Sequence, residues 1–409
     1  MERVETLIIG AGQAGLAMSW HLSQLGCEHL VLERARIAES WQSQRWDSLC
    51  FQFPNWSIEL PGHPPYDGGP PDAFAPRGEV HRFLAEYGRA IRAPVRRDAT
   101  VTRMRRYGDR GFCLTTPQGE LLARRVVVAT GPYQRAFIPA LAQGLPAGVV
   151  QVHAGDYRNS AALPFGAVMV VGSGASGCQI ADELVEAGRR VHLCVGRHQR
   201  TPRHYRGRDV FWWRRELGQL DQTAADVPVE RRTPPPLVTG VRGGYDVDLR
   251  ESAKRGLSLL GHLHGIDEGR FQFADDLTSN LDCGDRSFDR FLASVDEFVV
   301  RTGLNAGSAH PRSAVADCTA VAAPATLDAR ADRIGSVIWA TGYRFDFGWI
   351  ELPDAFDAAG TPIHVRGVAA VPGLYFIGLP WLHKRKSTFL SGVGEDAGFI
   401  AASIAGNVA

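Results

Sequence analysis

The stretch VMVVGSGASGCQIADEL, residues 168–184, has the pattern of a buried strand, a tight glycine turn and a helix. A very similar stretch, TLIIGAGQAGLAMSWHL, occupies residues 6–22. Both begin with a short apolar run, which is typical of a central strand in a parallel sheet. A second apolar run follows each helix, at residues 29–32 and 191–195. The chain therefore contains two complete β-α-β units, each of the kind that binds a dinucleotide.

The first unit carries the pattern G-x-G-x-x-G at Gly10, Gly12 and Gly15. The first glycine permits the tight turn, the second lets a pyrophosphate approach a helix N-terminus, and the third lets helix and strand pack closely. Glu33 ends the next strand, where an acid can accept hydrogen bonds from an adenosine ribose. An N-terminal unit of this kind binds FAD more often than NAD, so we interpret it as the FAD site, with contacts from Gly10, Gly12, Gln13, Ala14, Gly15, Glu33 and Arg34.

The second unit repeats the glycine pattern, but no acid ends its following strand. Arg197, Arg200 and Arg203 cluster there instead, with His198 between them. An acid would repel a ribose 2′-phosphate, whereas guanidinium groups can bind it, so the cluster favours NADPH over NADH and over a second FAD. A solvated basic loop is the alternative, and a nucleic-acid contact is less favoured. The predicted NADPH contacts are Gly172, Ser173, Gly174, Ala175, Ser176, Gly177, Arg197, His198 and Arg203.

The bulk composition excludes several classes of protein. The 409 residues suit two domains, and a net charge of +1 gives no reason to expect a nucleic-acid or membrane partner. No apolar run reaches the roughly 20 residues that span a bilayer. The seven cysteines contain no Cys-x-x-Cys pair and no zinc-like cluster, so we predict reduced thiols and no metal site. No secretory signal is visible, which favours the cytoplasm.

The remaining strand-like segments suggest how the two units are joined. Two of them end in similar turns, Ala129-Thr130-Gly131 and Ala340-Thr341-Gly342, and a closing helix is expected over residues 395–404. We predict an α/β fold with two Rossmann-like dinucleotide-binding domains, the NADPH domain being inserted into a discontinuous FAD domain. The expected boundaries are 1–150 and 325–409 for the FAD domain and 151–324 for the NADPH domain.

The two units and the two Ala-Thr-Gly turns resemble those of flavoproteins with two dinucleotide-binding domains. The finer resemblance is to the class B flavin monooxygenases, and within these to short bacterial flavoprotein oxidoreductases. It covers nearly the whole chain and is strongest at residues 6–66, 126–200 and 337–402. The resemblance implies FAD and NADPH as cofactors, a small-molecule substrate and dioxygen, with no nucleic-acid or membrane partner. A homodimer is compatible with it.

Several local segments carry this resemblance. ESWQSQRWDSL, residues 39–49, is similar to a family segment that covers the flavin, which implies that Trp41, Arg45 and Trp46 lie near FAD; ordinary core packing is the alternative. Asn55 in FPNW stands where the family carries an active-site asparagine, so it is our candidate catalytic residue, although turn chemistry favours asparagine there as well. The resemblance also assigns to the cofactors Ala129, Thr130, Gly131, Thr341, Gly342, Tyr343, Gly378 and Gly394.

The segment GVVQVHAGDYRN, residues 148–159, aligns with the family fingerprint around His153 and Tyr157. It lacks the tryptophan of the Baeyer–Villiger version and its N-terminal phenylalanine. The resemblance therefore favours oxygenation of nitrogen or sulfur over Baeyer–Villiger oxygenation. We expect His153 to link the domains rather than to act as a catalytic residue.

The resemblance implies that NADPH reduces FAD, that dioxygen adds to the reduced flavin as a peroxyflavin, and that one oxygen atom passes to an amine nitrogen or a sulfur. The alternatives are Baeyer–Villiger chemistry and an NADPH oxidase or reductase without oxygen transfer. A flavin disulfide reductase would need paired redox cysteines, which the spacing of the cysteines does not provide. A nucleotide-sensing flavoprotein is the alternative from outside enzymes.

Overall fold

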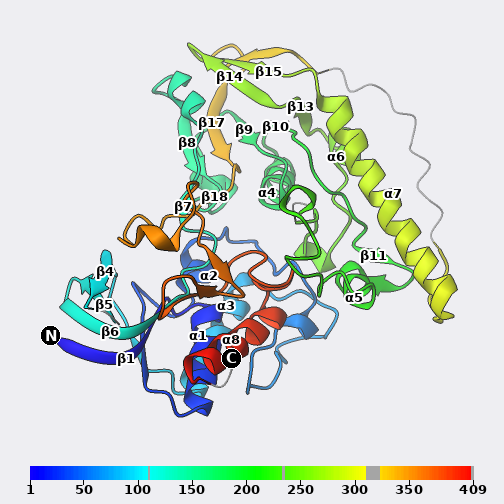
Figure 1. The fold of residues 1–409 in the computed structure, drawn as a ribbon. Helices are drawn as coiled ribbons and strands as arrows, with labels where there is room; N and C mark the ends of the chain where they lie inside the picture. The colour runs from blue at the N-terminus through cyan, green and yellow to red at the C-terminus, as the bar shows by residue number, and fades with distance from the viewer. Residues whose placement is uncertain (109–110, 233–234, 310–322, 407–409) are drawn as a thin grey trace.

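The computed structural model describes residues 1–108, 111–232, 235–309 and 323–406. Figure 1 shows two lobes, each built on a sheet with helices packed against it. The α/β prediction with two dinucleotide-binding units is confirmed. The predicted closing helix is also present as α8 (Leu390–Ile404), which begins five residues earlier than the sequence suggested.

The first sheet has the strand order β19-β20-β21-β6-β1-β2-β3, and β4 and β5 extend it beside β6. β1, β2, β6 and β21 run parallel at its centre. Helix α1 (Gln13–Gln24) follows β1 and packs with α8. The strand bounds are β1 Glu2–Ile9, β2 His29–Leu32, β3 Val95–Arg96, β4 Arg103–Tyr107, β5 Gly111–Thr116, β6 Gly119–Val128, β19 His364–Val365, β20 Val368–Ala369 and β21 Leu374–Phe376.

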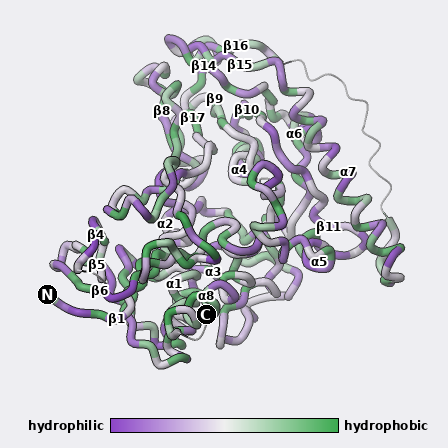
Figure 2. The backbone as a smooth tube through the Cα atoms, viewed as in Figure 1, coloured by the Kyte–Doolittle hydropathy of each residue, from purple (hydrophilic) through white to green (hydrophobic). Residues whose placement is uncertain are grey.

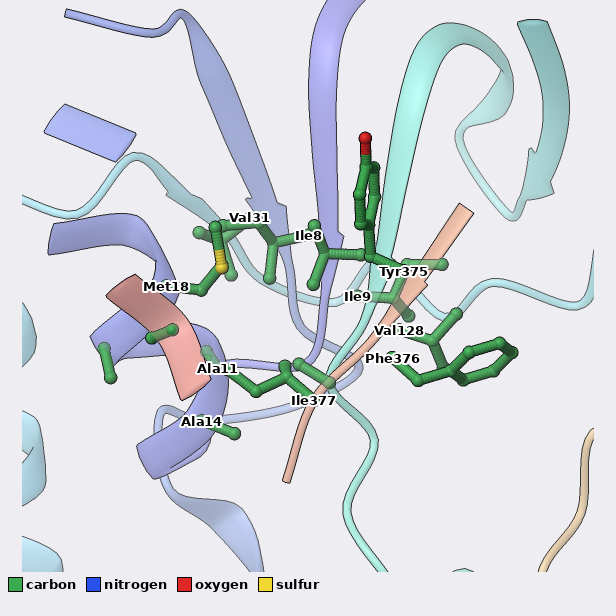
Figure 3. Close-up of a cluster of buried hydrophobic side chains, with 14 of the residues drawn as sticks. Ile8, Ile9, Ala11, Ala14, Met18, Val31, Val128, Tyr375, Phe376 and Ile377 are labelled. Atoms are coloured by element: carbon green, nitrogen blue, oxygen red, sulfur yellow. The ribbon is translucent and has the colours of Figure 1, made fainter. Parts of the chain in front are cut away.

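The core of the first lobe explains why this arrangement is stable. Ile8, Val31, Val128 and Phe376 come from the four central strands and are all nearly inaccessible to solvent. Figure 3 shows these side chains together, with Met18 of α1 beside them. Burial of one such side chain stabilises a fold by about 1.5–3 kcal/mol. Figure 2 accordingly shows hydrophobic residues gathered around α1 and α8.

The second sheet has the order β13-β10-β9-β17-β8, and its strand pairs are all parallel. Helix α4 (Ala175–Glu186) follows β9 as α1 follows β1. The long helix α7 (Leu277–Thr302) runs along the outer side of this lobe (Figure 1). The strand bounds are β8 Val150–His153, β9 Ala167–Val171, β10 Val191–Cys194, β13 Ser258–Leu260 and β17 Ile334–Trp339.

Shorter elements complete the two lobes. The helices are α2 Glu39–Ser43, α3 Arg77–Ala90, α5 Val210–Glu216 and α6 Leu249–Lys254, and the strands are β7 Arg135–Ala136, β11 His204–Tyr205, β12 Arg208–Asp209, β14 Leu263–Asp267, β15 Arg270–Phe273, β16 Thr326–Asp328 and β18 Tyr343–Arg344. Strands β7 and β18 pair with each other where the chain leaves the first lobe and returns to it.

Strand pairing places the second domain boundary later than the sequence suggested. β17 pairs with both β9 and β8, so residues 334–339 belong to the second sheet, although the expected boundary assigned residues 325–409 to the first domain. The apolar composition of this strand suits either sheet, and only its partners decide between them. We therefore propose that the second domain extends to the β7–β18 crossing.

Candidate functional site

The first glycine turn is shaped by two glycines and left open at a third. Gly10 has a φ of 108°, and a Cβ there would lie 2.7 Å from the carbonyl oxygen of Ala129. A Cβ on Gly15 would lie 1.9 Å from the carbonyl oxygen of Gly10. A Cβ on Gly12 would meet no atom within 4 Å. Gly10 and Gly15 are therefore required by the turn itself, and Gly12 leaves its outer surface accessible.

The second glycine turn repeats this construction. Gly172 also has a φ of 108°, and a Cβ there would lie 2.6 Å from the carbonyl oxygen of Ala340. A Cβ on Gly177 would lie 1.8 Å from the carbonyl oxygen of Gly172, whereas one on Gly174 would meet nothing within 4 Å. Each turn thus packs against the Ala-Thr-Gly segment of its own sheet.

Both turns fit the diphosphate of a dinucleotide. Gly12 and Gly174 are the N-caps of α1 and α4, and neither helix has a side-chain cap. The first N–H groups of a helix need acceptors, and together with the helix dipole they favour an anion. The open glycine at each N-cap gives a phosphate room to reach these groups. Predicted contacts Gln13, Ala14, Ala175 and Ser176 lie in the same first turns.

The two turns differ in what stands beside them. Glu33 is 7% exposed, and its carboxylate accepts hydrogen bonds from the N–H groups of Ala11 at 2.8 Å and Ala35 at 3.0 Å. The carboxylate is thereby fixed at the edge of the first turn. At the second turn the hydroxyl of Ser173 accepts from the Gly196 N–H at 3.0 Å. The second turn therefore has an uncharged link where the first has an acid.

The three arginines after β10 have different surroundings. Arg197 is exposed, and no ion pair is recorded for it within the described part of the chain. Arg200 pairs with Asp285 at 2.8 Å and Asp248 at 2.5 Å. Arg203 is 1% exposed, and its Nη2 lies 2.6 Å from an oxygen of Asp209. Of the three, Arg197 has the guanidinium that is free to reach a phosphate, and Arg203 is held inside the protein.

The Arg203–Asp209 pair makes a direct prediction about stability. Asp209 also caps α5 by accepting from the Phe211 N–H at 2.6 Å. Removing one partner of a buried pair leaves an uncompensated charge, which costs about 3–5 kcal/mol. Arg203→Met should therefore lower the free energy of unfolding in urea by about this amount, with the exposed Arg208→Gln variant as control. A loss below about 1 kcal/mol would contradict the structural role of Arg203.

His198 is also buried, at 6% exposure, with its Nδ1 3.1 Å from the Gly196 carbonyl oxygen. Burial lowers its pKa. A Cβ on Gly284 would lie 2.4 Å from its Nε2, so the ring packs closely against α7. The predicted contact of His198 with NADPH therefore remains a prediction, and its present surroundings are those of a packing residue.

Asn55 lies beside an aromatic cluster formed by Phe53, Trp56, Phe211 and Phe389. Asn55 is 2% exposed, its Nδ2 donates to the Pro70 carbonyl oxygen at 2.9 Å, and its Oδ1 has no hydrogen-bond partner in the described structure. The Phe53 ring centroid lies 4.3 Å from that of Phe211 and 4.9 Å from that of Phe389. A buried acceptor without a partner is costly and points to a ligand that would satisfy it.

The loop before α8 brings this cluster to the first glycine turn. The Gln13 side chain donates a hydrogen bond to the Thr388 carbonyl oxygen. A Cβ on Gly378 would lie 2.7 Å from the Ala14 Cβ, and His21 Nε2 is 3.1 Å from the Gly394 carbonyl oxygen. The predicted residues Gln13, Ala14 and Gly378 therefore lie together near the N-terminus of α1, whereas Gly394 faces the last turn of α1 through His21.

The predicted residues of the 39–49 segment separate into two groups. Arg45 lies between two rings, with its guanidinium carbon 5.6 Å from the Trp41 centroid and 5.0 Å from the Tyr133 centroid. Trp46 is 4% exposed and packs in the hydrophobic core of the second lobe, together with Tyr157. Trp41 and Arg45 thus lie where the lobes meet, whereas Trp46 has the surroundings of a core residue.

The other predicted residues gather where the chain crosses between lobes. His153 Nε2 lies 2.9 Å from the Gly342 carbonyl oxygen, and its ring contacts Tyr343 edge to face at 4.7 Å. A cavity of about 970 Å³ beside them is lined in part by Tyr133, Tyr343 and Phe347. The Thr341 hydroxyl donates a hydrogen bond to the Phe137 carbonyl oxygen. Gln134 Nε2 donates to Thr130 Oγ1 at 2.9 Å and to the Gly131 carbonyl oxygen. Arg34, which follows Glu33, is exposed to solvent.

The sequence did not single out Asp396, a buried carboxyl in the second turn of α8. It is 2% exposed, and burial raises its pKa to about 6. Its Oδ2 has no hydrogen-bond partner among the described residues. No sequence motif includes Asp396. A single aspartate in an apolar helix is ordinarily expected on the side that faces solvent, so the sequence offered no reason to expect it to be buried.

Within residues 1–108, 111–232, 235–309 and 323–406, no three His, Cys, Asp or Glu side chains gather as metal ligands would. In the same ranges, no helix is both long and apolar enough to cross a membrane.

The sequence is similar to those of known proteins. Residues 7–220 match the model of the pyridine nucleotide-disulphide oxidoreductase family. A protein of Geobacillus kaustophilus named uncharacterized oxidoreductase CzcO-like is 33% identical over 399 residues, which cover 97% of each chain. A protein of Arabidopsis thaliana named probable indole-3-pyruvate monooxygenase YUCCA3 is 27% identical and covers 50% of this chain and 48% of its own.

The fold is also similar to that of a solved structure. A flavin-containing monooxygenase of Stenotrophomonas maltophilia superposes with a TM-score of 0.67 at 22% identity. The match covers 100% of both chains. The two-lobe arrangement is therefore shared over the full length of both proteins.

Proposed function

Because this chain belongs to the pyridine nucleotide-disulphide oxidoreductase family and is an oxidoreductase dependent on FAD and NADPH, we propose that it oxygenates a small organic substrate. The proposed acceptor is an amine nitrogen or a sulfur, and Baeyer–Villiger oxygenation of a carbonyl compound is the second choice. One observation carries the cofactor part of the proposal: two glycine turns of the same construction differ in the charge beside them, as expected for two different dinucleotides. The names of the monooxygenase relatives support oxygenation.

We assign FAD to the first turn and NADPH to the second. Glu33 would accept hydrogen bonds from the adenosine ribose of FAD, and the open Gly12 would admit its pyrophosphate. Gly174 would admit the pyrophosphate of NADPH. When bound and reduced, the flavin supplies the reaction with dioxygen. The N-termini of α1 and α8 meet at the loop of Thr388 and Phe389, so we place the reactive part of the site there.

The side chains around that loop would orient the substrate and exclude water. Asn55 Oδ1 is buried and unpartnered within the described structure, so it is available to accept a hydrogen bond from a bound group. The amide would in this way fix the position of the cofactor or substrate. The stacked rings of Phe53, Phe211 and Phe389 would supply apolar surface to the site, and a dry site strengthens each polar contact inside it.

Arg197 makes the cofactor preference testable. Arg197→Glu should raise the Michaelis constant for NADPH by roughly tenfold to a hundredfold, because a charged hydrogen bond contributes about 1.5–3 kcal/mol. The constant for NADH should change much less, since NADH has no 2′-phosphate. Steady-state kinetics with both nucleotides measure this, with the exposed Arg208→Gln as a comparison that should leave the NADPH preference in place. Equal effects on both nucleotides would contradict the assignment of Arg197.

A disulfide reductase is less well supported by the cysteines. The six described cysteines, Cys27, Cys50, Cys113, Cys178, Cys194 and Cys283, are free thiols, and Cys318 lies outside the described residues. Cys178, beside the second glycine turn, is 2% exposed, and burial raises its pKa. A thiol of raised pKa is a poor nucleophile and a poor leaving group.

The proposed oxygenation is tested by comparing oxygen consumed with hydrogen peroxide released during NADPH turnover. A panel of amines, sulfides and ketones is added in turn to the FAD-loaded enzyme. A substrate should lower the peroxide released per oxygen consumed and yield a product carrying one added oxygen atom. If peroxide equals oxygen consumed with every compound, the protein is an NADPH oxidase. A homodimer in the cytoplasm remains part of the same proposal.

A further inference from the structure

Two arginines lie beside the aromatic cluster, outside both glycine turns. Arg214 follows Phe211 by three residues on α5, and Arg385 precedes Phe389 by four residues in the loop that leads into α8. Residues three apart on a helix share a face. The two phenylalanine rings are 5.9 Å apart. Helix α5 and the loop before α8 therefore each contribute one arginine and one phenylalanine beside the contact between Phe211 and Phe389.

Arg214 is buried and forms no ion pair with an acid in the described part of the chain. It is 8% exposed, its Nη1 donates to Gln219 Oε1 at 2.9 Å, and its guanidinium carbon lies 5.2 Å from the Phe291 centroid. Its Nε is buried and has no hydrogen-bond partner in the described structure. Burial and then the nearby charge of Arg385 lower the pKa of Arg214 to about 10.

Arg385 has matching surroundings. Its Nη2 donates to Gln222 Oε1 at 3.0 Å, and its guanidinium carbon lies 5.0 Å from the Trp381 centroid. Its Nε is also buried without a partner among the described residues. Burial lowers its pKa. Both guanidinium groups thus have a neutral glutamine and an aromatic ring as their recorded partners.

The neighbouring acids do not neutralise this pair. Asp221 and Glu395 each lie within 2.9 Å of both Lys384 and Lys386, and among the described residues no ion pair joins an acid to Arg214 or Arg385. Two buried like charges without an acid are unfavourable, because burial removes water and their mutual repulsion is stronger in a low dielectric. An anion bound between them would remove this cost, since guanidinium groups bind carboxylates with two parallel hydrogen bonds.

We propose that Arg214 and Arg385 form a buried site for the carboxylate of the substrate, whose apolar part contacts Phe211 and Phe389. The site lies near the first glycine turn, because Gln13 is hydrogen-bonded to the residue before Phe389. The substrate class is therefore an apolar or aromatic carboxylic acid. Assigning the anion to the substrate rests on the proposed oxygenation, whereas the existence of an anion site does not.

Binding to the oxidised FAD-loaded enzyme tests the proposal without turnover, so a failed oxygenation assay does not affect it. Benzoate and phenylacetate are titrated by calorimetry, with benzyl alcohol as the neutral analogue and chloride and phosphate as inorganic anions. The aryl carboxylates should bind about tenfold or more tightly than each of these, because charged hydrogen bonds and apolar contacts combine. Arg214→Met and Arg385→Met should each weaken benzoate binding by about the same factor.

Matched variants separate this role from a structural one. Arg208 is an exposed arginine on β12, and the Arg208→Gln variant should bind benzoate as the wild type does. In buffer of low anion content, Arg214→Met should unfold at a temperature no lower than the wild type, since it removes an uncompensated charge. Benzoate should then raise the unfolding temperature of the wild type more than that of the variant.

Three results would overturn the proposal. Arg214→Met could lower the unfolding temperature equally at every benzoate concentration, which would indicate a structural arginine. Chloride or phosphate could bind as tightly as benzoate, which would indicate a free inorganic anion. The variant could raise the Michaelis constant for NADPH, which would place the pair at the cofactor. If Arg214→Met does not fold, two other measurements test the proposal. These are benzoate binding by the Arg385→Met variant, in which the replaced arginine is only half-buried, and the comparison of benzoate with benzyl alcohol in the wild type.

Discussion

Replacing Gly174 by valine is expected to give a folded, yellow protein whose flavin NADPH reduces at least about a hundredfold more slowly at limiting NADPH. A Cβ at Gly174 meets no atom within 4 Å, and its φ of −71° suits any residue. The substitution should therefore leave the fold intact. Its side chain would stand where the pyrophosphate must approach α4, and losing two charged hydrogen bonds of about 1.5–3 kcal/mol each accounts for the expected effect.

Anaerobic stopped-flow spectroscopy of the flavin absorbance measures this rate. Gly148→Val provides a matched control, because a Cβ there also meets nothing within 4 Å and Gly148 is far from both turns in the sequence. The control should be reduced as fast as the wild type. If Gly174→Val were reduced at the wild-type rate across all NADPH concentrations, the second turn would not be the NADPH site.

Replacing Gly12 by valine should give a folded protein that has lost its FAD and is therefore colourless, unlike Gly174→Val, which keeps its FAD. Gly12 has a φ of −83° and an open Cβ position, so the turn tolerates a side chain, while the FAD pyrophosphate loses its approach to α1. By the same reasoning, the dissociation constant for FAD should rise by roughly 10² to 10⁴. Gly15 would be a poor choice for this test, because its Cβ would lie 1.9 Å from the Gly10 carbonyl oxygen and would disrupt the fold.

The flavin content of the purified variant, measured against protein concentration, is the first readout. Titration of the apoprotein with FAD then gives the dissociation constant, and circular dichroism checks the fold. NADPH should still bind to this variant, since its second turn is unchanged. A variant that retains FAD with the wild-type affinity would contradict the assignment of FAD to the first turn.

The sequence predicted the features that depend on residues close together in the chain. Each glycine turn and its neighbouring strands lie within about 30 residues, so their spacing is enough to predict a β-α-β unit. The two differing environments also followed from sequence, because Glu33 directly follows β2 and no acid directly follows β10. The family resemblance to class B flavin monooxygenases is likewise confirmed.

The features that the sequence could not predict depend on contacts between residues far apart in the chain. β17 has the composition of a central strand in either sheet, and its hydrogen bonds to β9 and β8 place it in the second. Arg203 has the same side chain as Arg197, but Asp209 holds it inside the protein. Arg214 and Asp396 were not predicted as site residues, because the burial of their side chains depends on elements far apart in the chain.

The most direct test of the account is anaerobic mixing of the FAD-loaded wild-type enzyme with NADPH and, separately, with NADH. We assign FAD to the first turn and NADPH to the second, so NADPH should reduce the bound flavin directly. NADPH should bleach the flavin absorbance at concentrations far below those that NADH requires, with no disulfide or thiol added. Flavin that stays oxidised with NADPH, or that responds to both nucleotides alike, would contradict this central claim.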